Sequence, residues 1–146
     1  MIKLLNILKE ITVNKPGDPN WPKVYNYIEN GSKGKLDLSN TDIKRLPNSL
    51  KKVGGNLWLN DTSITSLPDG LTVRGYLDLR NTPITSLPDG LTVGGGLDLS
   101  STQITSLPDG LIVGGNLYLR NTPLSQTHTE EQIRQMTPGV KGNIYI

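Results

Sequence analysis

Hydrophobic positions recur with a period of 20 residues between residues 34 and 124. Each unit opens on a leucine, any residue and a second leucine. Further along come a threonine, an isoleucine or leucine, a Leu-Pro pair, another leucine and a valine close to a glycine. The opening leucines are Leu36, Leu57, Leu77, Leu97 and Leu117, of which the first two are 21 residues apart and the others 20. A period this regular is typical of a repeat protein.

Each unit holds too few aliphatic residues to enclose a core of its own, so neighbouring units must stack and share one. The alternation in Leu-x-Leu predicts a short strand with its leucines facing inward, one strand per coil at a spacing of about 4.8 Å. Proline followed by Asp-Gly predicts turns on the opposite side, at Pro68, Pro88 and Pro108. The pattern therefore predicts a right-handed α/β repeat solenoid with a parallel face of about six short strands.

The front of the chain predicts a helical N-terminal cap, which a solenoid needs because its first coil would otherwise expose core and strand edge. Pro22 stands near a helix start and Gly31 beyond its end, which frames a helix over residues 21–30. Residues 1–11 predict a further helix. The side chains expected to cover the first coil are Val24, Tyr25 and Ile28.

The back of the chain predicts a short capping helix followed by a last strand. Thr129 and Gln132 form a capping box for a helix that ends at about Met136. Residues 140–146 then repeat the pattern of residues 113–119, which predicts a sixth strand. One structural domain is expected, made of a cap at 1–33, five repeats at 34–124 and a second cap at 125–146.

These repeats resemble the leucine-rich-repeat family, L-x-L-x-x-N-x-L-x-x-L-P, and especially its short 20-residue bacterial subclass with the Leu-Pro step. The resemblance covers residues 34–124 and implies a leucine-rich-repeat solenoid. The chain departs from the family where asparagine is usual, because its repeats have threonine there. Hydroxyls are then expected to satisfy backbone groups of the turns. The threonines are Thr41, Thr62, Thr82, Thr102 and Thr122.

The residues before, between and after the two leucines are expected to form three columns on the outer face of the strands. The core positions hardly vary between units, whereas these columns do. They contain residue types that dominate interface energies, displayed on a rigid sheet. The predicted partner-binding face consists of Trp58, Tyr76, Asp78, Arg80, Asp98, Tyr118 and Arg120.

This face also has a purely structural interpretation. Aromatic side chains on a strand face cover neighbouring backbone, and Asp98 is placed to pair diagonally with Arg80 across adjacent strands. Asp78 and Asp98 are neighbours in one column, where their like charges repel. A partner's cation or arginine would relieve that repulsion, and solvent would do so as well.

Three other patterns in the sequence bear on chemical sites. Asp69, Asp89 and Asp109 form a column of carboxylates that suits a shared calcium ion, but Pro-Asp-Gly is also a common turn sequence. His128 is the single histidine, and no acid–base partner or activated serine accompanies it. The glycines at 94–96 lack the Lys-Ser/Thr that follows a phosphate loop. We expect no catalytic residue, cofactor or metal, and therefore no enzyme.

Composition and charge bear on the compartment and on nucleic acid. The chain has no cysteine, which suits a reducing cytosol without requiring it. Residues 1–55 carry 10 Lys and Arg against 5 Asp and Glu, but the net charge of +2 is small for a nucleic-acid binder. Polar residues interrupt the apolar residues 1–11, and neither a cleavage site nor a membrane span is predicted. We expect a cytoplasmic or virion protein that binds neither membrane nor nucleic acid.

Three functions fit a solenoid without a catalytic set. The favoured one is a scaffold for protein–protein interaction within a larger assembly such as a phage particle, since residues 1–11 resemble the starts of small bacteriophage proteins. The alternatives are a binding-only effector and a soluble inhibitor that masks a partner. Some effectors of the Leu-Pro subclass carry a ubiquitin-ligase domain, which depends on a cysteine that this chain lacks. The edge of the terminal strand also allows pairing with a second copy.

Overall fold

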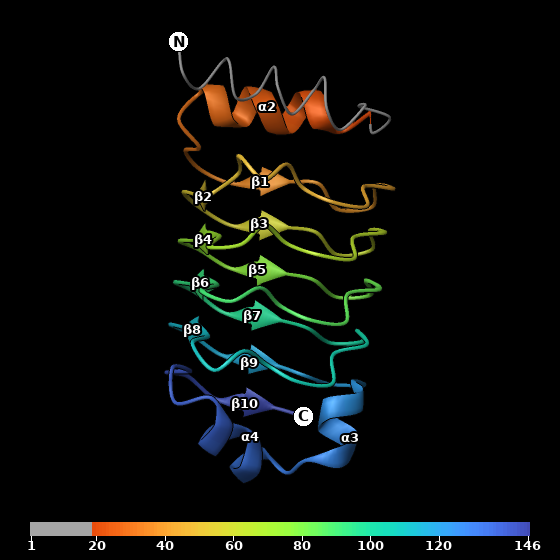
Figure 1. Ribbon diagram of the computed structural model, residues 1–146, viewed down its shortest axis with the longest axis vertical. Helices are drawn as coiled ribbons and strands as arrows, with labels where there is room; N and C mark the ends of the chain where they lie inside the picture. Colours follow the sequence, from red (N-terminus) through yellow and green to blue (C-terminus); the bar gives the residue numbers. More distant parts are fainter. Residues whose placement is uncertain (1–18) are drawn as a thin grey trace.

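The five leucine pairs and the final Ile144–Tyr145 segment form a parallel sheet of six short strands, one from each successive turn of the chain. The computed structural model describes residues 19–146, and Figure 1 shows its strands stacked along the long axis of the molecule. Neighbouring strands pair in register, so that Leu77 lies beside Leu97. The strand order is β1 (Leu36–Asp37), β3 (Leu57–Trp58), β5 (Leu77–Asp78), β7 (Leu97–Asp98), β9 (Leu117–Tyr118) and β10 (Ile144–Tyr145). The predicted parallel solenoid and its sixth strand are confirmed.

A second parallel sheet runs along the stack, where the sequence predicted only corners. Its strands are β2 (Lys52–Val53), β4 (Thr72–Val73), β6 (Thr92–Val93) and β8 (Ile112–Val113). Each valine is fully buried while the residue before it faces outward. Strands of two residues carry too little alternation to be recognised, and the following glycines indicated a turn. The expectation of one strand per coil was therefore wrong.

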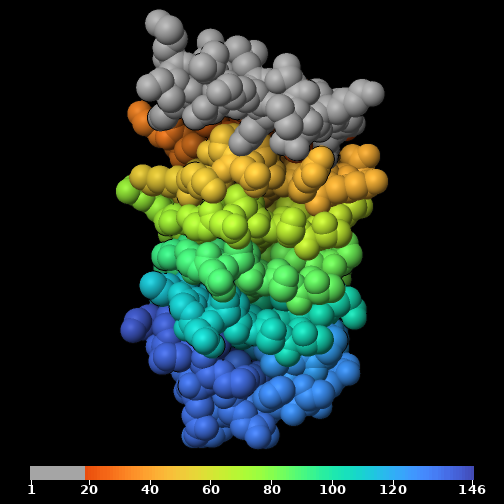
Figure 2. All heavy atoms as spheres, viewed as in Figure 1, coloured from red at the N-terminus to blue at the C-terminus, as the bar shows by residue number. Residues whose placement is uncertain are grey.

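The core is one continuous column of aliphatic side chains between the two sheets. It extends from Trp21 to Ile144, and most of its leucines, isoleucines and valines have no exposed surface. Figure 2 shows the coils as successive layers along the stack. Burial of each such side chain contributes about 1.5–3 kcal/mol. Because the apolar side chains of every coil pack against those of the next, the coils depend on one another for stability.

The five repeat threonines bond to the backbone of their own turns, as the sequence predicted. In each case the hydroxyl donates to the carbonyl oxygen of the leucine three residues earlier, at distances from 2.6 Å (Thr102) to 2.8 Å (Thr122). All are buried except Thr41, which is half-buried. The hydroxyls thus satisfy carbonyl groups that have lost contact with water.

Helices lie at the two ends of the strand stack. In Figure 1, α2 (Trp21–Glu29) lies over β1, with Trp21, Val24 and Tyr25 buried. Its bounds confirm the helix predicted over residues 21–30. The helix ends before Gly31, whose φ of 83° favours glycine. The helix predicted over residues 1–11 lies outside the described residues.

Two short helices precede the last strand. The first, α3 (Pro123–Thr127), was not predicted, and it ends at Thr127, where the 20-residue period would place the leucine of the next Leu-Pro pair. The second, α4 (Glu130–Met136), begins after Thr129 with the expected capping box to Gln132. It contacts β10. Across residues 19–146, no helix has the length and apolar character needed to cross a membrane.

Candidate functional site

All seven residues predicted for the binding face lie on the outer side of the six-stranded sheet, but two of them are not displayed. Trp58, Tyr76 and Tyr118 are half-buried, and Arg80 and Arg120 are exposed. The two aspartates are buried, with exposed fractions of 0% for Asp78 and 8% for Asp98. The expectation that Asp78 faces a partner is therefore corrected, whereas Asp98 keeps a small exposed fraction.

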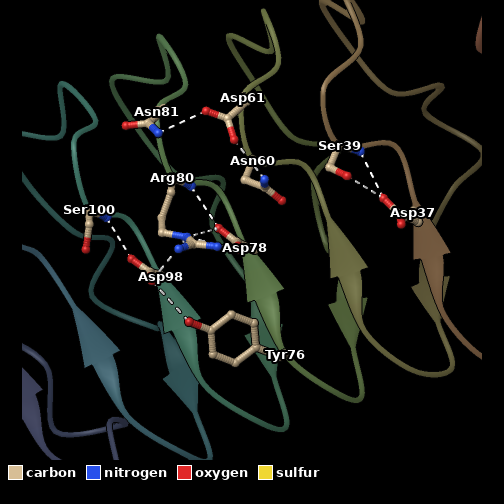
Figure 3. A network of polar contacts seen from close by, with 10 residues as sticks. All are labelled: Asp37, Ser39, Asn60, Asp61, Tyr76, Asp78, Arg80, Asn81, Asp98 and Ser100. Carbon is tan, nitrogen blue, oxygen red and sulfur yellow. Dashed lines mark hydrogen bonds and ion pairs between the residues drawn. The ribbon is translucent and has the colours of Figure 1, made fainter.

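Arg80 buries these aspartates by folding back over them (Figure 3). Its Nε donates to the two carboxylate oxygens of Asp78 at 2.9 and 3.1 Å, and its Nη2 donates to Oδ2 at 2.6 Å. The same Nε lies 3.6 Å from Oδ2 of Asp98 on the next strand. The predicted diagonal pair is present. It is the chain's own arginine that offsets the repulsion between the two carboxylates.

The backbone completes the binding of each carboxylate. In each case the backbone N–H of the residue two positions later in the chain donates to the aspartate. The N–H of Arg80 donates to Asp78 at 3.1 Å, and that of Ser100 donates to Asp98 at 2.9 Å. Asp37 accepts the same bond from Ser39, together with the Ser39 hydroxyl at 2.7 Å. These bonds to Ser39 hold the pKa of Asp37 below its usual value. The bond to Asp78 raises the pKa of the Arg80 guanidinium above its usual value.

Tyr76 links the aromatic side chains to this charged network. Its hydroxyl donates to Oδ2 of Asp98 at 3.2 Å, and Figure 3 shows the ring directed toward that carboxylate. A Cβ on Gly96 would lie 2.8 Å from Cε2 of Tyr76, so the ring occupies the space above this glycine. Burial raises the pKa of the Tyr76 phenol well above its usual value, and the negative charge of Asp98 adds to the rise.

Aromatic rings form two close pairs on either side of Asp98. Trp58 and Tyr76 have ring centroids 5.6 Å apart, while Tyr118 and Tyr145 stack at 4.9 Å with an interplanar angle of 12°. The guanidinium of Arg120 lies 5.7 Å from the centroid of the Tyr145 ring. Offset stacks and cation–π contacts fix such rings in place. Tyr145 was not among the predicted contact residues, although residues 140–146 carry the repeat pattern that indicated it.

Asparagines that directly precede the strands bond to the tyrosine hydroxyls on the outer face. Nδ2 of Asn116 donates to the hydroxyl of Tyr118 at 3.2 Å, and Asn143 donates in the same way to Tyr145 at 3.3 Å. Oδ1 of Asn116 meanwhile accepts the backbone N–H of Asn143 at 2.9 Å. Both rings are therefore held at the face by bonds to the neighbouring column as well as by stacking.

A row of small polar residues borders the face where the strands end, and sequence reasoning missed it. The residues share a left-handed backbone with φ between 54° and 58°, and they are Asn40, Asp61, Asn81, Ser101 and Asn121. Amides of Asn60 and Asn81 each donate to Asp61 at 2.9 Å and hold the pKa of Asp61 below its usual value. The signal was available, since asparagine and aspartate tolerate this conformation and one of them precedes four of the five repeat threonines.

The other candidate residues lie away from this face. His128 follows α3, with Nδ1 2.9 Å from the hydroxyl of Thr127, and it lines a pocket of about 240 Å³ with Ser106 and Asp109. Asp69, Asp89 and Asp109 are exposed in the turns. Within residues 19–146, no three His, Cys, Asp or Glu side chains gather where they would hold a metal ion.

Comparison with models of known protein families and with curated proteins gives no match for this chain. Its likeness to leucine-rich repeats accordingly rests on the repeated residues between 34 and 124.

Proposed function

We propose that the chain is a non-catalytic leucine-rich-repeat scaffold that binds another protein through the outer face of its six-stranded sheet. The observation that carries this proposal is the row of partly exposed aromatic rings, Trp58, Tyr76, Tyr118 and Tyr145, fixed beside the exposed Arg80 and Arg120. Tryptophan, tyrosine and arginine provide most hot spots of protein interfaces. Rings that are already ordered lose little entropy when a partner binds.

The position of the helices supports the scaffold interpretation. In this proposal α2 caps the front coil and α4 caps β10, so the strand edges are covered and the broad strand face is left for binding. The threonine column takes the place of the asparagine usual in the family. A right-handed sense and one domain with caps at 1–33 and 125–146 belong to the same proposal.

A double variant tests the face directly. Trp58→Ala with Tyr118→Ala removes one ring from each aromatic pair without touching the core leucines, so the protein is expected to fold. Partners are captured from the source cells on immobilised protein, identified by mass spectrometry, and their Kd values measured with purified partner. We expect the double variant to weaken binding by about 100-fold or more, because two hot-spot rings are lost.

The matched control lies on the second sheet. Thr92→Ala with Ile112→Ala changes two outward residues of β6 and β8 and is expected to leave the Kd unchanged. Equal affinity of the face variant and the wild type would place the contact elsewhere, and the end helices would then be the next surface to test.

The place of the scaffold in an assembly is a separate proposal. The resemblance of residues 1–11 to bacteriophage proteins favours a component of a phage particle over an effector or a soluble inhibitor. Quantitative mass spectrometry of purified particles is expected to find the chain in constant ratio to the major particle proteins. Its absence from particles, together with a tightly bound cytosolic partner, would favour the inhibitor.

A further inference from the structure

The charges on the strand face do not balance at Asp98. Among the residues that the structure describes, Arg80 forms the ion pairs with both Asp78 and Asp98, so two carboxylates share one guanidinium. The sharing is unequal. Asp78 receives all three short side-chain bonds of Arg80, whereas Asp98 has only a 3.6 Å contact with that guanidinium. The other bonds to Asp98 come from the neutral Tyr76 hydroxyl and the Ser100 N–H, which carry no charge to offset its own. One negative charge is therefore left at Asp98.

Asp98 is nearly buried, yet its side chain keeps a small exposed fraction that Asp78 lacks. Its side chain is 11% exposed, while that of Asp78 is 0% exposed. On one side the Tyr76 ring fills the space above Gly96, whereas on the other the residue that follows on the same face is the small Ser100. A partner group is thus able to approach Asp98, whereas Arg80 and the sheet close off Asp78.

Aromatic residues lie on both sides of the Asp98 carboxylate. Tyr118 lies beside Asp98 in the strand register, and Tyr76 reaches it with its hydroxyl from the other side. A carboxylate between two tyrosine rings suits a planar cation, which pairs with the charge and lies against the rings.

We propose that the partner protein inserts an arginine side chain at Asp98, between the rings of Tyr76 and Tyr118. This inference rests on the proposed function, and it specifies the chemistry of the partner at the middle of the face. The inserted guanidinium neutralises the charge that Arg80 leaves, and burial beneath a partner strengthens the pair because water is excluded. Acidic side chains of a partner would be repelled from this point and attracted toward the exposed Arg120.

The test uses short peptides, so that it does not depend on identification of the partner. The full chain is labelled with ¹⁵N and titrated with acetyl-Gly-Arg-Gly-amide, and amide shifts are followed by NMR. A citrulline peptide removes the positive charge at nearly constant shape, and a glutamate peptide reverses the sign of the charge. We expect saturable shifts centred on residues 96–100, with millimolar affinity for the arginine peptide alone.

Two charge-matched variants show whether Asp98 is responsible. Asp98→Asn removes the carboxylate charge and is expected to weaken arginine-peptide binding by about tenfold or more. Asp109→Asn makes the same change at an exposed turn residue and is expected to have no effect. Thermal unfolding of both variants verifies that they fold, and Tyr76→Phe provides a second variant that keeps the ring but loses the bond to Asp98.

The inference and the proposed function fail in different ways. The arginine site is overturned if the arginine peptide causes no amide shifts, if the citrulline peptide causes equal shifts, or if the shifts persist in Asp98→Asn. A partner that still depends on Trp58 and Tyr118 would then leave the binding face standing. Conversely, the arginine site stands if the peptide binds as expected while no partner depends on those two rings, and in that case the proposed function fails.

Discussion

At the scale of single residues, backbone conformation is the strictest requirement of the repeat. The residue before each repeat threonine adopts a left-handed backbone, and in four of the five coils it is asparagine or aspartate. Short polar side chains tolerate that conformation because they bond locally to the backbone. Ser101 is the exception, with φ of 58°. It is therefore the position at which a better residue for this conformation is available.

Ser101→Asn is expected to stabilise the protein by about 0.5–1 kcal/mol, because asparagine adopts the left-handed backbone at lower cost than serine. Urea unfolding followed by circular dichroism measures the change. The reverse substitution Asn121→Ser in the next coil serves as the control, with an expected loss of similar size. A loss of stability in Ser101→Asn would show that something other than backbone conformation selects this residue.

Ionisation of Tyr76 is a second property of a single residue, and it predicts sensitivity to alkaline pH. Its pKa in the folded protein is raised above the ordinary 10.0, so the folded state retains the phenol proton more tightly than the unfolded chain does. The associated stability is fully present below pH 10 and is lost as the pH rises through the folded pKa. Wild-type stability is therefore expected to fall faster above pH 10 than that of Tyr76→Phe, measured by urea unfolding. Parallel pH curves for the two proteins would contradict this.

At the scale of elements, the two sheets differ in how far the sequence predicts them. The six-stranded sheet follows from Leu-x-Leu, because two buried leucines around one outward residue indicate a strand. The four-stranded sheet does not follow, since a single valine before a glycine corner is equally typical of a turn. The corners themselves depend on close backbone stacking. A Cβ on Gly95 would lie 2.9 Å from the carbonyl carbon of Gly75.

Gly95→Ala is accordingly expected to destabilise the protein by about 1–3 kcal/mol, because the added methyl group forces adjacent corners apart. Gly110→Ala is the control, since a Cβ at that turn meets nothing within 4 Å. Urea unfolding measures both variants. Equal stability of the two would mean that the corners yield at little cost and that the glycines serve another purpose.

At the scale of the whole molecule, stacked coils convert a short repeated sequence into a fixed surface. The columns of this surface were predictable, because register follows from the leucine spacing. Burial of Asp78 and Asp98 was not predictable, since it depends on the direction in which the long side chain of Arg80 folds. The aromatic pairs were likewise not predictable from the sequence, because the orientation of a ring depends on its neighbours, such as Gly96 beneath Tyr76. Sequence therefore located the face, whereas its charge pattern required the structure.

Oxidative footprinting of the complex tests the binding face most directly. Hydroxyl radicals label exposed side chains, and mass spectrometry compares the labelling of free protein with that of partner-bound protein. We predict that Trp58, Tyr118 and Tyr145 lose reactivity on binding, while Met136, which is 45% exposed on α4, keeps its own. Protection of Met136 with unchanged reactivity of Trp58 and Tyr118 would contradict the account, because the partner would then contact the end of the solenoid and not its strand face.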